Sequence, residues 1–309
     1  MISPNIYKWI GLATLAILLI FEMIIALGEF SMDSVELSDD RPFPSSYVAN
    51  SQLGRKRNPS FRDAAEKKYF RDICKDDLKR TRPQFFDVVE WKRKSLFGGL
   101  HEQDRVMLGK YYGTANSVFE WGLGESSYMA GHLNVPRYAG VDSHAEWVSK
   151  ARDQVSSHFF QWHMEEHILL SNFPSSHQCP KHYRFYFGDI GETLVNKYGR
   201  PVEHLPKSEY DYIISPLMSE LCPFDVYMVD GRYRAACALM ALLHASDHDK
   251  DATILIHDYT HHRPGYKIVE QVCDIVEDSG QRLVAFKRKP NVTNELIYEL
   301  YQQVKDISE

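Results

Sequence analysis

The sequence lacks an excess of positive charge. Among its 309 residues, 36 are lysine or arginine and 42 are aspartate or glutamate, so the formal net charge at pH 7 is -6. A protein that binds DNA or RNA usually presents a basic surface to the phosphate backbone. This charge balance therefore disfavours a nucleic-acid partner, and it suits a small molecule or a glycan better.

Cysteine is also scarce. The five cysteines form no CxxC pair and no spacing typical of a zinc site, which argues against a zinc-binding module. Cys237 and Cys273 lie in apolar stretches and are predicted to be buried thiols. The other three, Cys74, Cys179 and Cys222, flank polar or proline-containing segments and are the candidates for pairing in an oxidising compartment.

Internal repeats and low-complexity tracts are absent, and there is one long hydrophobic run, residues 10–27, interrupted only by Thr14 and Glu22. Eighteen helical residues at about 1.5 Å each nearly cross a hydrocarbon core about 30 Å thick. The run therefore predicts a membrane anchor. A cleaved signal peptide is the alternative, but the run exceeds a usual signal core of about 7–15 residues.

The orientation of such an anchor follows from its flanks. Lys8 precedes the run and acidic residues follow it, so a cytosolic Lys8 would place the body in the lumen of the secretory pathway, as a type II protein of the ER or Golgi. The sequon Asn291-Val292-Thr293 fits that location. The expected organisation is an anchor (1–28), a stalk (29–60) and one enzyme domain (61–309) made of a helical preamble (61–115), a core (116–290) and a terminal helix (291–309).

Short β-rich runs alternate with helical runs after the preamble, which is typical of a parallel sheet covered by helices. A final pair of runs around a tight turn predicts an antiparallel hairpin. We therefore expect an α/β fold with a doubly wound, Rossmann-like sheet closed by a hairpin. The expected strands are 117–121, 137–141, 183–187, 225–229 and 253–256, the hairpin strands are 272–276 and 282–288, and the expected helices are 144–170, 191–199, 233–245, 265–272 and 294–307.

A glycine-rich turn follows the first expected strand. Gly122 and Gly124 let the backbone pass close beneath a ligand and present amide groups to it. Asp142 ends the next strand, twenty positions after Gly122, where an acid binds ribose hydroxyls in nucleoside-binding βαβ units. Ser127 stands where a dinucleotide fingerprint has its third glycine. A nucleoside without a pyrophosphate therefore fits better than a dinucleotide.

With these motifs, residues 100–290 resemble the class I S-adenosylmethionine-dependent methyltransferases. The segment Glu120-Trp121-Gly122-Leu123-Gly124 is similar to the first motif of that family, which lies under the methionine part of the cofactor. The resemblance implies that Asp142 holds the ribose and that Asp189, after Gly188, lies beside the adenine. The cofactor residues it implies are Glu120, Gly122, Gly124, Ser126, Asp142 and Asp189.

Two further acids follow apolar strands. Asp230 ends the fourth strand, and Asp258 follows His257 after the fifth. Ligands of open α/β sheets lie beyond the carboxyl ends of the strands. The resemblance to small-molecule O-methyltransferases therefore implies that Asp230, His257 and Asp258 are catalytic, with a Mg²⁺ ion shared by the two acids, or with His257 as a base. The alternatives are that Asp258 caps a turn and that His257 is a packed imidazole.

Basic residues surround this expected reaction centre. Arg232 and Arg263 are predicted to bind an anionic group of the substrate. Arg234 and Lys267 are expected to be solvated instead. Arg232 and Arg234 also occupy the place where related methyltransferases often have a histidine-containing segment, so His257 would have to supply the imidazole.

The sequence thus predicts a membrane-anchored methyltransferase that uses S-adenosylmethionine to methylate an oxygen of a small molecule or glycan. An inert domain of the same fold, acting as a scaffold or binding subunit of a membrane complex, is the alternative from another class. A nicotinamide-dependent oxidoreductase is disfavoured by Ser127 at the third glycine position.

Overall fold

The computed structural model describes residues 83–93, 99–156, 182–194, 199–220, 222–246 and 251–308. The expected anchor, the stalk and the first part of the helical preamble lie outside these residues. Among the helices that are described, none has both the length and the hydropathy that a membrane span requires.

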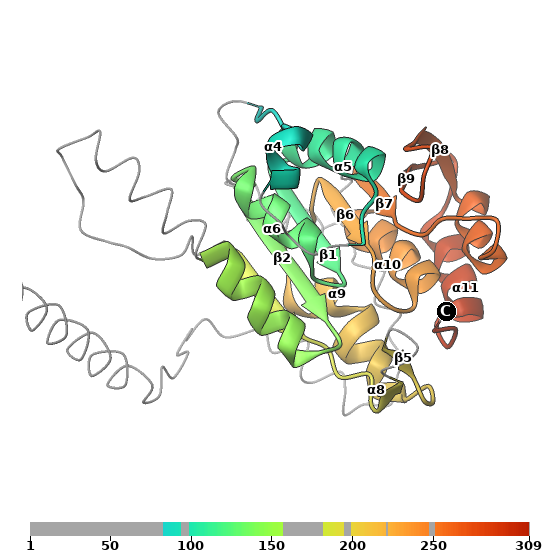
Figure 1. Ribbon diagram of the computed structural model, residues 1–309. Coiled ribbons are helices and arrows are strands. Elements are labelled where there is room, and N and C mark those ends of the chain that lie inside the picture. Colours follow the sequence, from blue (N-terminus) through green and yellow to red (C-terminus); the bar gives the residue numbers. More distant parts are fainter. Residues whose placement is uncertain are drawn as a thin grey trace, which may run out of the picture. The chain divides into compact units, whose positions relative to one another are not determined.

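Seven strands form the central sheet in the order β3-β2-β1-β6-β7-β9-β8 (Figure 1). The first five strands in this order pair in parallel, whereas β9 pairs antiparallel with both β7 and β8. The predicted parallel sheet closed by a hairpin is therefore confirmed. The strands are β1 (Ser117–Trp121), β2 (Arg137–Asp142), β3 (Tyr183–Phe187), β6 (Val226–Val229), β7 (Thr253–Ile256), β8 (Cys273–Asp278) and β9 (Val284–Arg288).

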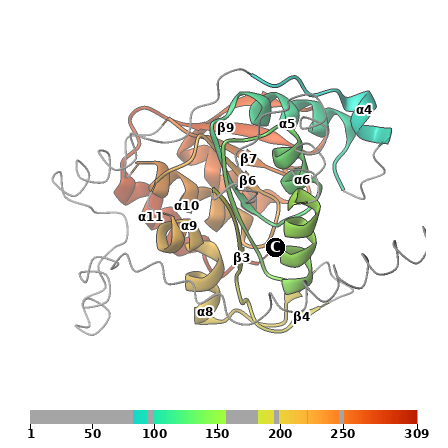
Figure 2. The same cartoon turned by 90° about the vertical axis from the view of Figure 1, so that its left-hand side faces the viewer.

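Side chains of each parallel strand alternate between two hydrophobic layers, because successive residues of a strand point to opposite faces. Phe119 and Trp121 of β1 belong to one layer and Val118 to the other. Helices cover both faces, with α10 and α11 on one side and α5 and α6 on the other (Figure 2). The sheet is thus doubly wound, as the sequence predicts.

The helices that cover the first face include α10 (Arg234–Ser246), which is buried along its length except at Ser246. A helix that is buried on all sides belongs in a core. The second face is covered by α5 (Glu102–Thr114), α6 (Glu125–His132) and a helical segment at residues 145–156. The other helices are α4 (Val88–Arg93), α8 (Pro206–Ser208), η3 (Glu209–Ile213), α9 (Ser215–Ser219), η4 (Pro264–Gln271) and α11 (Asn294–Val304).

One predicted helix is wrong in its described part. Instead of a helix at 191–199, a short antiparallel pair joins β4 (Thr193–Leu194) to β5 (Arg200–Pro201). Gly191 precedes β4 and Gly199 precedes β5, with φ angles of 84° and 75°, and such positive values lie outside the right-handed helical region. The hairpin also differs from expectation, since β8 continues through Glu277 and Asp278 and the turn comes after them.

The cysteines behave as predicted where they are described. Cys237 and Cys273 are free and buried. Cys222 is disulfide-bonded. Cys74 and Cys179, the other two candidates for pairing, lie outside the described residues.

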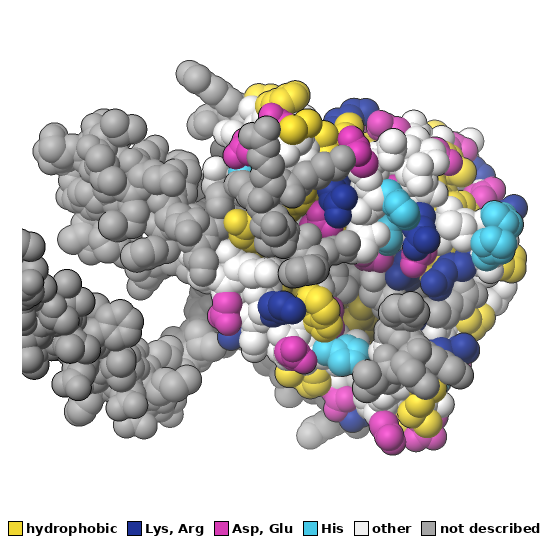
Figure 3. Space-filling model, in the orientation of Figure 1, with side chains coloured by type: hydrophobic (Ala, Val, Ile, Leu, Met, Phe, Trp, Pro, Cys, Tyr) yellow, Lys and Arg dark blue, Asp and Glu magenta, His cyan; other side chains and the backbone are white. Residues whose placement is uncertain are grey.

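Acidic and basic side chains are interspersed over the described part of the face drawn in Figure 3. A basic groove that follows a phosphate backbone would instead gather one sign of charge.

Candidate active site

A cavity of about 500 Å³ opens at the carboxyl ends of β1, β2 and β6. This is where ligands bind in open α/β sheets. Several of the predicted site residues line it together, although they are far apart in the sequence. They are Gly122, Gly124, Ser126, Asp142, Asp230 and Arg232.

The two glycines of the turn have different constraints. Gly122 has a φ of 87°, and a Cβ built on it would lie 2.6 Å from the amide nitrogen of Gly231. This position is therefore glycine because the backbone after β6 passes against it. A Cβ on Gly124 meets nothing within 4 Å, so this position faces open space.

Glu120 does not line the cavity, although the resemblance places it with the cofactor. Its carboxylate is fully buried behind the turn and accepts hydrogen bonds from Ser126, Ser127 (2.8 Å) and Tyr138. Burial raises the pKa of Glu120 to about 7, although these hydroxyl donors oppose the shift. In this structure Glu120 and the Ser126 hydroxyl hold the start of α6 against β1, and Ser126 still forms part of the cavity wall.

Asp142 lies at the cavity and also shapes the glycine turn. One carboxylate oxygen accepts the amide of Leu123 at 2.8 Å, and the other accepts the amide of His144 at the same distance. His144 lines the cavity too, and the carboxylate of Asp142, 3.7 Å from its Nδ1, raises its pKa. Asp142 therefore connects β2 to the turn after β1, in the place expected for a ribose-binding acid.

Asp189 is not brought to the cavity. Its carboxylate accepts hydrogen bonds from Lys207 at 2.5 Å and from the amide of Gly191 at 2.8 Å. The hydrogen bond from Lys207 is the main reason why the pKa of Asp189 is lowered. Its assignment to the adenine stays a prediction from the resemblance.

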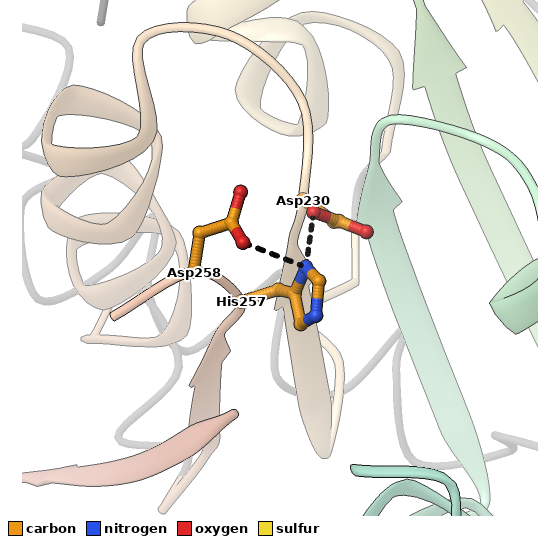
Figure 4. Close-up of side chains that lie close together, drawn as sticks. All are labelled: Asp230, His257 and Asp258. Atoms are coloured by element: carbon orange, nitrogen blue, oxygen red, sulfur yellow. Dashed lines mark hydrogen bonds and ion pairs between the residues drawn. The ribbon is translucent and has the colours of Figure 1, made fainter. Parts of the chain in front are cut away.

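The three predicted catalytic residues do lie together (Figure 4). Nδ1 of His257 lies 2.8 Å from Oδ1 of Asp230 and 3.9 Å from Oδ1 of Asp258. Asp230 belongs to the cavity wall, whereas His257 and Asp258 are set behind it. The two strand ends therefore converge as predicted, but only one of the two acids faces the cavity.

Arginines surround the carboxylate of Asp258. Arg234 lies 3.0 Å away, Arg282 3.2 Å and Arg263 3.5 Å. Burial raises the pKa of Asp258, but the charges of Arg234, His257 and Arg263 outweigh this effect and lower it. Arg263 thus contacts an acid of the protein and a tyrosine, Tyr266, rather than lining the cavity.

Arg234 is buried, so the expectation of a solvated helix start is wrong. Its guanidinium donates to the carbonyl oxygens of His257 (2.5 Å) and Gly231 (2.9 Å), and it also pairs with Asp230 at 3.2 Å. The burial of Arg234 could not be predicted from local sequence, because its partners come from the ends of two different strands. Lys267 is exposed, as expected.

The charges of this cluster do not fit a divalent cation. One possible ligand atom from each of Asp230, His257 and Asp258 lies within 4.8 Å of the others. However, Asp258 already pairs with three guanidinium groups, and Asp230 pairs with Arg234 and His257. Magnesium prefers carboxylates whose negative charge is available and that leave room for bound waters. The arginines supply the positive charge that an ion would bring.

His257 is also poorly placed to act as a base toward a substrate. It is 4% exposed, with Nδ1 at Asp230 and Nε2 3.6 Å from Oδ2 of Asp104. Burial lowers its pKa, but the charges of Asp230, Asp104 and Asp258 outweigh this effect and raise it to about 9. The alternative of a packed imidazole describes it better, with both ring nitrogens facing carboxylates.

Sequence reasoning missed several residues around the cavity. Asp104 comes from α5, which precedes the sheet, and no motif connects it to His257. Trp147 and Tyr212 also line the cavity, and Tyr212 comes from a segment that carries no recognisable pattern. The signal for Trp147 was available, since it lies in the first turns of the helix after Asp142.

Comparisons with known proteins give matches among solved structures alone. No protein-family model matches the chain, and no curated protein matches its sequence. A methyltransferase-like protein from Silicibacter pomeroyi is 24% identical, with 68% of this chain and 98% of that one covered and a TM-score of 0.49.

Two further structures are more distant. A protein assigned as an O-methyltransferase from Klebsiella pneumoniae is 9% identical, with 84% and 82% of the two chains covered and a TM-score of 0.32. SMU.776, assigned as a methyltransferase and solved in complex with SAH, is 10% identical, with 62% and 50% covered and a TM-score of 0.35. These similarities are at the level of the fold, and the strand order of this chain confirms the predicted doubly wound, Rossmann-like sheet closed by an antiparallel hairpin.

Proposed function

We propose that this protein is an S-adenosylmethionine-dependent methyltransferase. The observation that carries the proposal is the cavity at the carboxyl ends of β1, β2 and β6, which brings together the glycine turn, Asp142 and Asp230. A large cavity with a few convergent polar groups is the usual form of a small-molecule site. The fold alone would not identify the function, because one fold serves many chemistries.

The residues around the cavity suit a nucleoside that carries an amino-acid tail. Gly124 leaves open space at the amino end of α6, and Asp142 offers carboxylate oxygens to ribose hydroxyls. His144 and Trp147 stand beside Asp142 on the same wall, where a purine ring would find an aromatic surface. Once bound, S-adenosylmethionine supplies an activated methyl group.

Asp230 is the residue that we assign to the methyl acceptor. One of its oxygens is bound by His257, and the other is directed away from His257 in Figure 4. An acceptor hydroxyl or amine would donate a hydrogen bond to that second oxygen, which orients the nucleophile and takes up its proton. His257 and Arg234 hold the carboxylate in place from behind.

Arg232 gives the acceptor side a positive group. It lines the cavity and is half-buried, and burial together with the nearby charge of Arg234 lowers its pKa. A guanidinium in such a place favours an acceptor with a carboxylate, sulfate or phosphate. An anionic small molecule or an acidic glycan is therefore the substrate class that we propose, with methylation at oxygen.

The expected anchor and orientation complete the proposal. Cys222 is disulfide-bonded, and disulfides persist in oxidising compartments such as the lumen of the secretory pathway. The disulfide therefore supports a lumenal location of the domain. Residues 10–27 would tether the protein to the membrane, and the enzyme would act on a lumenal acceptor.

Mass spectrometry of ligand retained by the purified full-length protein tests the cofactor. S-adenosylmethionine or S-adenosylhomocysteine is the expected ligand, and methyl transfer from labelled cofactor to a panel of acidic glycans and carboxylate metabolites should follow. A retained nicotinamide nucleotide would refute the proposal. An inert scaffold would retain no nucleoside and transfer no methyl group.

A further inference from the structure

Asp104 is a buried acid with no place in any sequence motif. It lies in the first turn of α5 and is fully buried. Its partners come from distant parts of the chain, namely the turn between β8 and β9 and the residue after β7. Burying an aspartate costs free energy unless hydrogen bonds and opposite charges compensate its carboxylate.

The two carboxylate oxygens of Asp104 contact different parts of the protein. Oδ1 accepts hydrogen bonds from the turn of the hairpin, from Ser279 Oγ at 2.6 Å, Leu283 N at 3.0 Å and Arg282 N at 3.1 Å. Oδ2 accepts the amide of His101 at 3.2 Å and faces Nε2 of His257 at 3.6 Å. The first set fixes the hairpin, and only the second reaches toward the cavity.

His257 lies between Asp104 and the cavity. Its buried ring turns Nε2 to Asp104 and Nδ1 to Oδ1 of Asp230, at 2.8 Å. Among the described residues, Nε2 makes no hydrogen bond, and the carboxylate of Asp104, 3.6 Å away, is the charge that pairs with this side of the ring. A carboxylate that orients one ring nitrogen fixes what the other nitrogen can do.

We propose that Asp104 is a positioning residue of the reaction centre: it fixes the imidazole of His257, and His257 in turn fixes the carboxylate of Asp230 at the cavity wall. The inference rests on the proposed function in one respect, since it assigns Asp230 to the methyl acceptor. Asp104 touches neither the cavity nor any ligand that the cavity would hold. It acts through His257 alone.

Proton NMR of the full-length protein in detergent, with ¹⁵N-labelled histidine, tests this chain directly. The wild type should show a downfield Nδ1–H resonance of His257, assigned by its loss in His257→Gln and by its shift in Asp230→Asn. In Asp104→Asn this resonance should be lost or broadened, because the ring is no longer held from behind.

Ser279→Ala is the matched control. It removes a hydrogen bond to Oδ1 of Asp104 and leaves Oδ2 and His257 in place. Both variants should lower Tm, since both weaken the hairpin contact, but Ser279→Ala should keep the wild-type resonance. An unchanged resonance in Asp104→Asn, or an equal loss in Ser279→Ala, would mean that Asp104 is structural only.

Two further measurements on the wild-type protein, the exchange of the Nε2 proton of His257 and the binding of S-adenosylhomocysteine, decide the remaining cases. If Asp104→Asn does not fold, the wild type still decides, because Nε2–H of His257 should also be visible and slow to exchange with water; its absence overturns the proposal. Calorimetry with S-adenosylhomocysteine is run on the same samples. Failure of the wild type to bind it would refute the proposed function, whereas the resonance of His257 reports on the chain from Asp104 to Asp230 regardless.

Discussion

At the scale of the residue, the two glycines of the turn after β1 have different roles: Gly122 is required by the fold, and Gly124 is required by the proposed ligand. Gly122 is held against Gly231 with a positive φ, whereas Gly124 borders open space in the cavity. In the sequence, Gly122 and Gly124 belong to the same motif and cannot be told apart. The structure distinguishes them because a Cβ at the first meets backbone and a Cβ at the second meets nothing within 4 Å.

Gly124→Val should therefore fold normally and bind S-adenosylhomocysteine at least about tenfold more weakly, a loss of about 1.4 kcal/mol. Gly122→Ala should lower the free energy of unfolding by about 1–3 kcal/mol, since it combines a positive φ with a backbone clash. Calorimetry and thermal unfolding measure the two effects. Gly280→Ala is the control for φ alone, because Gly280 has a φ of 75° and no neighbour within 4 Å. Wild-type affinity in Gly124→Val would contradict the placement of the cofactor.

Glu120 gives a prediction about pH. Burial raises its pKa from 4.5 in the unfolded chain to about 7 in the folded protein. Below pH 4.5 the carboxyl is protonated in both states, and its contribution to stability is complete. As pH rises through 7, the unfolded chain has already released its proton and the folded protein must do so at a cost, so the contribution is lost.

The free energy of unfolding should accordingly fall between pH 5 and pH 8 by more in the wild type than in Glu120→Gln, and the difference should be on the order of 3 kcal/mol. Urea unfolding at the two pH values measures it. An identical pH dependence in the variant would show that Glu120 is not the titrating group.

At the scale of the element, Arg234 joins the carboxyl ends of β6 and β7 to the start of α10. It is buried, pairs with both Asp230 and Asp258, and donates to two backbone carbonyls. Removal of one partner from a buried charge network leaves the other charges uncompensated, which is far more costly than the loss of an exposed pair.

Arg234→Met should lower the free energy of unfolding by about 3–5 kcal/mol. Arg282→Met is the matched control, because Arg282 also pairs with Asp258 but is 49% exposed, and its loss should cost less than about 1 kcal/mol. Denaturant unfolding compares them. Equal small losses in both variants would mean that the buried arginine does not organise the strand ends.

The elements that the sequence predicted well are those with a strong local pattern. Examples are the apolar run Thr253–Ile256 and the stretch from Ala235 to Leu243, which is apolar throughout and lies within α10. The helix predicted at 191–199 is wrong in its described part, because the pattern does not reveal the positive φ angles of Gly191 and Gly199. In the site, strand-end acids and glycines were predictable from their positions. Asp104 and the burial of Arg234 were not, since they depend on which distant elements pack together.

At the scale of the whole molecule, the expected anchor and the lumenal orientation are open to a direct test. Asn291 of the sequon is exposed just before α11, whose N-cap is Thr293, so the folded domain leaves room for a glycan there. In microsomes the protein should resist carbonate extraction, and protease should spare the domain. Asn291→Gln should then migrate faster on a gel. Digestion of the domain in sealed vesicles would reverse the orientation.

Titration of the full-length protein with S-adenosylhomocysteine in a calorimeter tests the central claim, that the cavity between β1, β2 and β6 is a cofactor site. We predict saturable binding by the wild type with one site per chain. Asp142→Ala should weaken it, because its carboxylate serves the ribose and the turn, and Asp230→Asn should leave it within about twofold, because Asp230 serves the acceptor. No binding by a folded wild-type protein, or equal binding by Asp142→Ala, would contradict the account.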